Sequence, residues 1–131
     1  MAAITRVLLT LSLLICIVST SYAAGTVSFD PAPAPGTVAG TIKVGGKLKL
    51  DAGTTTMAKT YEVWIWVDGK EEKAYGSLPL VDKGGGDYSM APIDHAGLTS
   101  GTEYNVMIIV DVEEGGAKKK VRCVATKVKA K

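Results

Sequence analysis

Short runs of Val, Ile, Thr and Tyr, interrupted every few residues by glycine, make up the chain after residue 23. All 15 glycines lie in this part. Such spacing is typical of β-strands joined by turns, and no helical periodicity persists beyond about two turns. Strands are predicted at residues 26–30, 37–44, 47–51, 60–68, 73–81, 87–91, 103–112 and 118–128. The pattern therefore predicts an all-β fold, an antiparallel sandwich of seven to eight strands.

The N-terminal segment has the features of an export signal. Arg6 is the only charge before a predominantly apolar run at 7–18, which is shorter than the about 20 apolar residues that span a bilayer. Ser21 and Ala23 place small residues at the two positions that a signal peptidase reads. We predict a signal peptide at 1–23 and a secreted or periplasmic protein without a transmembrane segment after cleavage. An uncleaved membrane anchor is the alternative.

The predicted mature chain divides into an N-terminal strand with a proline-rich spacer at 24–36 and a sandwich domain at 37–131. Alternating prolines at 31–35 predict an extended, unpaired spacer. Gly45-Gly46 predicts a tight hairpin between two strands. After cleavage Cys123 is the only thiol, which excludes an internal disulfide. Its position on one face with Val121 and Ala125 predicts burial.

Two predicted strands, at 60–68 and 103–112, show the clearest alternation of side chains. One face of each is apolar, and we expect these faces to form the core. The expected core residues are Tyr61, Val63, Ile65, Val67, Tyr104, Val106, Ile108 and Val110. The opposite faces combine tryptophans with acidic, amide and apolar side chains.

Residues 98–104 read Leu-Thr-Ser-Gly-Thr-Glu-Tyr, and the alternating Val106, Ile108 and Val110 follow. This pattern resembles the entry to the sixth strand of a fibronectin type III domain, where the motif is Leu-x-Pro-Gly-Thr-x-Tyr. Ser100 stands at the proline position, and residues 37–51 lack the tryptophan that the family carries on an early strand. The resemblance implies an immunoglobulin-like sandwich in which the Tyr104 hydroxyl is hydrogen-bonded back to the backbone as a tyrosine corner.

A second resemblance is to prealbumin-like sandwich modules of bacterial surface proteins. Their motif places Gly-x-Tyr before a Leu, a Gly and another Tyr. The matching residues here are Gly86, Asp87 and Tyr88, followed by Leu98, Gly101 and Tyr104. Both families imply noncatalytic binding, adhesion or spacing, and neither motif identifies a ligand.

Trp64 and Trp66 of one strand and Met107 and Ile109 of the other are predicted to form a contiguous exposed apolar patch that binds a ligand or partner. This prediction requires the two strands to be neighbours in one sheet. Indoles two residues apart lie about 7 Å from each other on one side of a strand, where both can stack on sugar rings or anchor a protein. The alternative is that the proline-rich segment or strand 73–81 covers the tryptophans as a second small core.

Charge is unevenly distributed along the predicted mature chain. Residues 24–117 hold seven basic and thirteen acidic residues, whereas 118–131 hold seven basic residues and no acid. Lys118, Lys119, Lys120 and Arg122 form a weak candidate site for anions. The alternative is a solvated last strand whose lysines protect a sheet edge from pairing. No aromatic residues are interleaved with these charges, so a specific nucleic-acid site is not predicted.

Catalytic, metal and cofactor sites are not predicted. His95 is the only histidine, no serine lies in a Gly-x-Ser-x-Gly elbow, and Asp82 and Asp87 are too few carboxylates for a calcium loop. We therefore expect an exported, non-catalytic binding or adhesion module that contacts protein or polysaccharide at the cell exterior. A small carbohydrate-binding module and a structural spacer without a ligand are the alternatives. The oligomeric state is left open.

Overall fold

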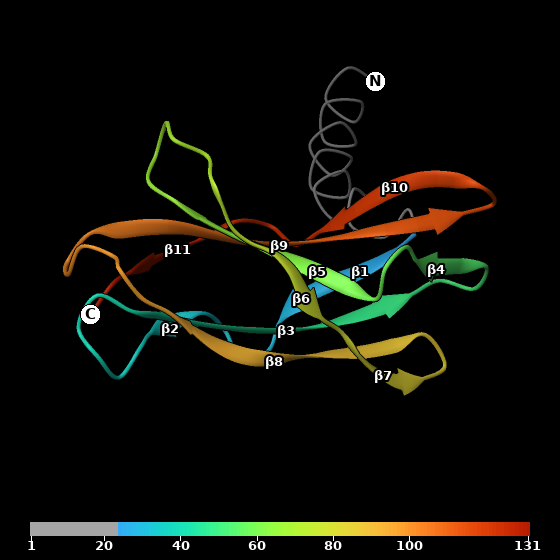
Figure 1. Ribbon diagram of the computed structural model, residues 1–131, viewed down its shortest axis with the longest axis horizontal. Helices are drawn as coiled ribbons and strands as arrows, with labels where there is room; N and C mark the ends of the chain where they lie inside the picture. The colour runs from blue at the N-terminus through green and yellow to red at the C-terminus, as the bar shows by residue number, and fades with distance from the viewer. Residues whose placement is uncertain (1–23) are drawn as a thin grey trace, which may run out of the picture.

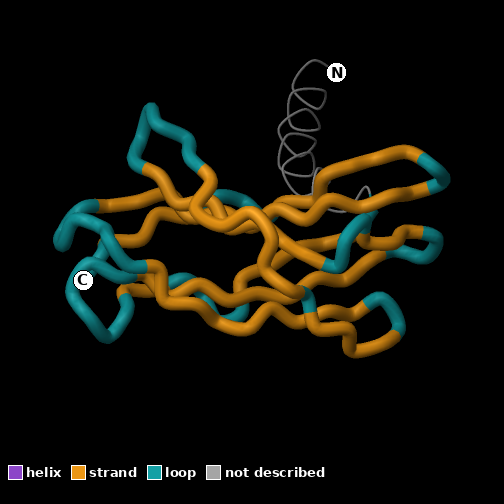
Figure 2. The backbone as a smooth tube through the Cα atoms, in the orientation of Figure 1, coloured by secondary structure: helices purple, strands orange, loops and turns teal. Residues whose placement is uncertain are grey.

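The computed structural model describes residues 24–131, so the predicted signal peptide and its cleavage site lie outside the described residues. This part of the chain is 63% strand and contains no helix. Accordingly, none of the described segments is a helix of the length and hydropathy needed to cross a membrane. Figures 1 and 2 show two layers of strands joined mainly by short loops.

Within residues 24–131 eleven strands follow one another, rather than the seven or eight predicted. They are β1 (Gly25–Phe29), β2 (Ala34–Pro35), β3 (Ile42–Leu50), β4 (Thr54–Thr56), β5 (Thr60–Trp66), β6 (Lys73–Pro79), β7 (Val81–Gly84), β8 (Asp87–His95), β9 (Glu103–Glu114), β10 (Ala117–Arg122) and β11 (Thr126–Lys129). Strands β2, β4 and β7 were not predicted and are only two to four residues long, too short to give an alternation pattern. The predicted strands 37–44 and 47–51 are the single strand β3, and the predicted strand 118–128 is divided into β10 and β11.

The strands form two antiparallel sheets, as expected for a β-sandwich. The first sheet has the order β1-β3-β8-β7, with β2 also paired to β3. The second has the order β10-β9-β5-β6, with β4 and β11 also paired to β9. Strand β9 is 12 residues long and organises the second sheet, because four other strands pair with it. It also carries the longest run of buried residues.

The core lies between the two sheets and follows the predicted alternation on β5 and β9. Val63, Val106, Ile108 and Val110 are fully buried, and Tyr61 and Ile65 nearly so. Ile42, Val44, Leu48 and Met90 of the first sheet complete the core from the other side. Two of the expected core residues, Val67 and Tyr104, are only partly buried. They lie beyond or near the end of a strand, where the layers no longer cover both sides.

The predicted hairpin at Gly45-Gly46 is wrong. Both glycines lie inside the continuous strand β3, where the register with β8 shifts between Val44 and Gly46. A Cβ on Gly46 would lie 2.8 Å from Ile108 Cδ1 and 2.8 Å from the Ser28 carbonyl oxygen. Glycine is therefore required here by close packing between layers and strands.

The proline-rich segment is also more structured than predicted. Ala34 and Pro35 form β2, which pairs with Lys43 and Ile42 at the edge of the first sheet, so these two residues are not unpaired. The prediction that Cys123 is buried is confirmed, since it is 6% exposed. Its Sγ accepts a hydrogen bond from the backbone N–H of Ile108 at 3.1 Å. Burial raises the pKa of the thiol to about 11.

Candidate functional site

The outward side chains at the centre of the second sheet form what we call the tryptophan face. Three cross-strand pairs build it, namely Glu62 with Ile109, Trp64 with Met107, and Trp66 with Asn105. The prediction that strands 60–68 and 103–112 are neighbours is thus confirmed. Because side chains alternate along a strand, burial of Val63 and Ile65 in the core places the tryptophans on the opposite side of β5.

The structure brings the four predicted patch residues together but does not leave all of them exposed. Met107 and Ile109 are only 6% and 5% exposed, so the expected exposure was wrong for these two. Ile109 lies between Glu62 of β5 and Arg122 of β10, and long side chains on both sides can cover it with their apolar stems. Trp64 and Trp66 are partly buried and pack against the core cluster. They keep part of their surface in solvent.

Polar contacts hold Trp64 in place. Its indole Nε1 donates a hydrogen bond to Glu62 Oε1 at 3.0 Å, and the other oxygen of this carboxylate lies 3.6 Å from Lys73 Nζ. Lys73 is also the cross-strand partner of Trp64 on β6. The indole is therefore oriented by Glu62 of its own strand, and Lys73 of the neighbouring strand β6 holds that carboxylate. The charges of Glu62 and Lys73 compensate each other.

A second polar cluster lies beyond Trp66, where the β5–β6 loop meets β9 and β11. Asn105 Nδ2 donates a 2.7 Å hydrogen bond to Asp68 Oδ1, and Lys127 Nζ lies 2.9 Å from Asp68 Oδ2. The hydrogen bond from Asn105, followed by that from Lys127, lowers the pKa of the Asp68 carboxyl. These contacts attach the start of the loop to the neighbouring strands.

A pocket of about 400 Å³ adjoins Trp66, and we call it the end pocket. The β5–β6 loop and the β8–β9 connection line it, with polar contributions from Lys70, Glu72, Lys73 and His95 and an apolar wall that includes Leu98. His95 Nδ1 lies 3.0 Å from the Tyr75 hydroxyl, and the two rings meet edge to face. Burial lowers the pKa of His95, so the imidazole is neutral at pH 7.

Sequence reasoning did not find the end pocket. The groups that line it come from residues 65–74, from the segment at 95–98 and from Tyr104, which are far apart along the chain. The available signal was the charged run at 68–73 directly after a strand with two tryptophans. The sequence does not show which loops meet at one end of the sandwich, so this run cannot be distinguished from a solvated turn.

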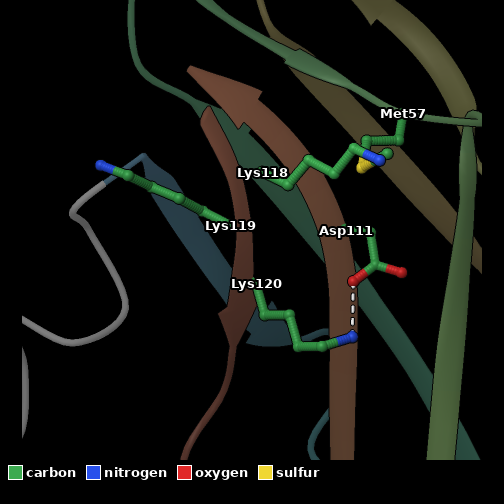
Figure 3. Close-up of a pocket in the computed structure, with 5 residues that line it drawn as sticks. All are labelled: Met57, Asp111, Lys118, Lys119 and Lys120. Carbon is green, nitrogen blue, oxygen red and sulfur yellow. Dashed lines mark hydrogen bonds and ion pairs between the residues drawn. The ribbon is translucent and has the colours of Figure 1, made fainter. Parts of the chain in front are cut away.

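The predicted anion site on β10 is partly occupied by internal ion pairs. Lys119 Nζ lies 2.7 Å from Glu114 and Lys120 Nζ 2.8 Å from Asp111. Figure 3 shows Lys120 directed at Asp111, Lys118 extended toward Met57, and Lys119 pointing away from both. These five residues line a pocket of about 340 Å³. The hydrogen bond to Asp111 raises the pKa of Lys120. Arg122 is exposed. The pairing of two of the four cations favours the solvated-edge interpretation of this strand.

The remaining candidates have structural explanations. The Asp82 carboxylate accepts a 2.8 Å hydrogen bond from the Gly84 backbone N–H, which stabilises the turn between β7 and β8. Within residues 24–131 no three His, Cys, Asp or Glu side chains are grouped to hold a metal ion. No protein-family model matches the sequence, and a comparison with curated proteins finds no match.

Proposed function

We propose that the protein is an exported, non-catalytic binding module with an immunoglobulin-like sandwich resembling fibronectin type III, and that its tryptophan face binds polysaccharide. The strand order supports the topology, because one sheet has the order β1-β3-β8-β7 and the other the order β10-β9-β5-β6, which matches strands A-B-E-D in one sheet and G-F-C in the other sheet of such a sandwich. The hydrogen bond between Thr99 and the Tyr104 hydroxyl fits a tyrosine corner at the same place.

The observation that carries the binding proposal is the contrast between the outer faces of the two sheets. The first sheet exposes short polar and basic side chains such as Thr26, Lys47 and Lys49, as solvated sheet faces usually do. The second keeps two partly exposed indoles about 7 Å apart on one strand. Aromatic side chains concentrated on one solvent-facing surface mark interaction sites.

The charges around the indoles favour a neutral, hydroxyl-rich ligand over a charged one. Glu62 is close to Lys73, and Asp68 is paired with Lys127, so these four charges around the indoles compensate one another. Carboxylate, amide and ammonium groups at its rim can accept and donate hydrogen bonds, while the indoles offer apolar area. A sugar ring presents hydroxyls at its edge and C–H groups on its faces, and it matches both.

Titration with soluble polysaccharides tests the proposal. Residues 24–131 are titrated with xylan, mixed-linkage β-glucan, glucomannan and chito-oligosaccharides while tryptophan emission is recorded. At least one glycan should shift the emission, and Trp64→Ala and Trp66→Ala should each weaken its binding by at least about tenfold, the effect of removing an interface anchor. Thr26→Ala on the other sheet is the matched control and should bind normally.

The alternatives predict different results. If no glycan changes the emission, polysaccharide binding is wrong, and loss of quenching protection on dilution would instead indicate self-association through this sheet. If both tryptophan variants bind normally but unfold at much lower denaturant concentration, the indoles are a second small core. In that case the protein is better described as a spacer without a ligand on this face.

A further inference from the structure

The end pocket lies between the two layers, at one end of the sandwich. On the side of the second sheet, Ile65, Val67 and Tyr104 contribute to its lining, and all three occupy inward positions of the side-chain alternation. On the side of the first sheet, His95 is the cross-strand partner of the fully buried Ile42, and directly opposed residues share one face of a sheet. The pocket is therefore a hollow between the ends of the layers, separate from the outward tryptophan face.

The apolar wall of the pocket is fixed by contacts within the fold. The backbone N–H of Leu98 donates a 3.0 Å hydrogen bond to the Gly40 carbonyl oxygen, and the Leu98 side chain packs against the core. The Tyr104 hydroxyl is held by the N–H of Thr99. A ligand that packs on this wall does not have to order it first. The volume of about 400 Å³ lies in the range of small-molecule sites, about 300–1,000 Å³.

His95 offers one fixed polar atom to the pocket. Its Nδ1 lies 3.0 Å from the hydroxyl of Tyr75, whose ring it meets edge to face. Among residues 24–131 the other ring nitrogen, Nε2, has no hydrogen-bond partner. No buried side-chain nitrogen of these residues lacks a partner, so Nε2 is accessible. Because His95 lines the pocket and Tyr75 does not, Nε2 is the ring nitrogen left for a ligand.

The charges at the rim of the pocket do not favour a charged ligand. Lys70 and Lys73 oppose Glu72 there, and Lys73 Nζ also lies 3.6 Å from Glu62. Lys70, Glu72 and Lys73 are exposed, and exposed charges on flexible side chains contribute little to binding. The imidazole of His95 is neutral at pH 7, since burial lowers its pKa. A hydroxyl group both donates and accepts, so it matches either tautomer of this ring.

We infer that the end pocket binds a small phenol-like molecule, with its apolar ring on the wall formed by Leu98 and Tyr104 and its hydroxyl hydrogen-bonded to His95 Nε2. An aromatic ring can pack against Tyr104 in an edge-to-face or offset arrangement. This site goes beyond the proposed function and does not depend on it, because the pocket and the tryptophan face lie on opposite sides of the second sheet.

Two probes that differ only in one hydroxyl test the inference. 4-Methylphenol and toluene are each titrated into ¹⁵N-labelled residues 24–131 while the backbone amide NMR signals are recorded. We expect 4-methylphenol to shift the signals of residues 65–74 and 95–98 saturably. Toluene should bind at the same place about fivefold more weakly, the effect of one net hydrogen bond. Both results come from the unaltered sequence, so they do not depend on the folding of a variant.

Three variants identify the atom that holds the hydroxyl. His95→Phe should weaken 4-methylphenol binding about fivefold without weakening toluene binding, because only the first compound loses a hydrogen bond. Tyr75→Phe is the matched control, since it removes the contact with Nδ1 and leaves Nε2 in place. It should bind both compounds normally. Lys70→Ala removes a rim charge and should also bind normally.

Three outcomes would overturn the inference. The first is the absence of saturable shifts with 4-methylphenol. The second is an equal loss for both compounds in His95→Phe, which would mean that the ring supplies only shape. The third is a set of shifts centred on Trp64 and Met107, which would place the compound on the tryptophan face. Glycan titration measures the other side of the sheet, so either proposal can fail while the other stands.

Discussion

The backbone N–H of Thr99 donates a 2.8 Å hydrogen bond to the hydroxyl of Tyr104, five residues further along the chain. This contact joins the connection between β8 and β9 to the second residue of β9, the strand with which four others pair in the second sheet. Such a bond was expected from the resemblance of residues 98–104 to a fibronectin type III strand entry. It also places Leu98 beside the end pocket, so the same connection that orders the fold shapes the candidate site.

Removal of this hydroxyl should cost a modest amount of stability. Tyr104→Phe is expected to lower the free energy of unfolding by about 1 kcal/mol, the net contribution of one hydrogen bond. The cost is small because water can replace the hydroxyl as the acceptor for the exposed N–H of Thr99. Urea unfolding followed by tryptophan emission measures the change. Tyr88→Phe is the control, because no hydrogen bond of its hydroxyl is found among the described residues, and it should be nearly neutral. Equal loss in both variants would show that the corner bond contributes nothing specific.

A charge at the centre of the core should prevent folding. Ile108 of β9 is completely buried, and Ile108→Asp would place an unpaired carboxylate between the two sheets, which costs several kcal/mol. We expect a loss of the β-sheet circular dichroism signal and of cooperative unfolding. The matched control, Val38→Asp, changes a valine that is 65% exposed and should stay folded. A folded Ile108→Asp protein would mean that the inward face of β9 is assigned incorrectly.

The layers of the sandwich were predictable because side-chain alternation on β5 and β9 is a local property. Alternation alone places Val63 and Ile108 on the inside, and it places Trp64 on the outside. It does not reveal how much of an outward side chain its neighbours cover. Met107 and Ile109 are buried by residues of β5 and β10, which the sequence could not place beside them without the register.

Gly45-Gly46 shows a second limit of sequence reasoning. Two adjacent glycines are expected in a tight turn, and they are also expected where a backbone passes close to other atoms. Only the second interpretation requires other atoms close to the backbone, and here these atoms belong to Ser28, Met90 and Ile108. These residues are distant in sequence, so the sequence does not show that they approach the glycines. The end pocket was missed for the same reason, since its two loops are joined only by the fold.

The packing role of Gly46 can be tested directly. A Cβ there would lie within 3 Å of Ile108 Cδ1, Met90 Sδ and the Ser28 oxygen, so Gly46→Ala should lower the free energy of unfolding by about 1–3 kcal/mol through overpacking. Gly76→Ala on the edge strand β6 is the control, because the nearest atoms belong to the flexible Lys73 side chain at 3.7 Å. It should be neutral or slightly stabilising. A neutral Gly46→Ala would contradict the close packing.

The buried thiol should make stability sensitive to alkaline pH. The pKa of Cys123 is raised from 9.0 to about 11 by burial, so the folded protein holds the thiol proton more tightly than the unfolded chain. The contribution of the protonated thiol to the free energy of unfolding is fully present below pH 9 and is lost as the pH rises toward 11. A shift of this size corresponds to at most about 2.7 kcal/mol. Cys123→Ala should therefore flatten the fall in unfolding free energy between pH 9 and 11.

Two measurements separate this effect from other groups. Burial also raises the pKa of Tyr61 above its ordinary value of 10.0. Tyr61 is present in both proteins, so the fall in unfolding free energy that its ionisation causes above pH 10 should appear in wild type and variant alike. At pH 8 a thiol reagent should label native Cys123 slowly and the urea-unfolded chain at once, since the thiolate is the reactive form. Rapid labelling of the native protein, or identical pH profiles for wild type and Cys123→Ala, would show that the thiol is accessible and titrates as in the unfolded chain.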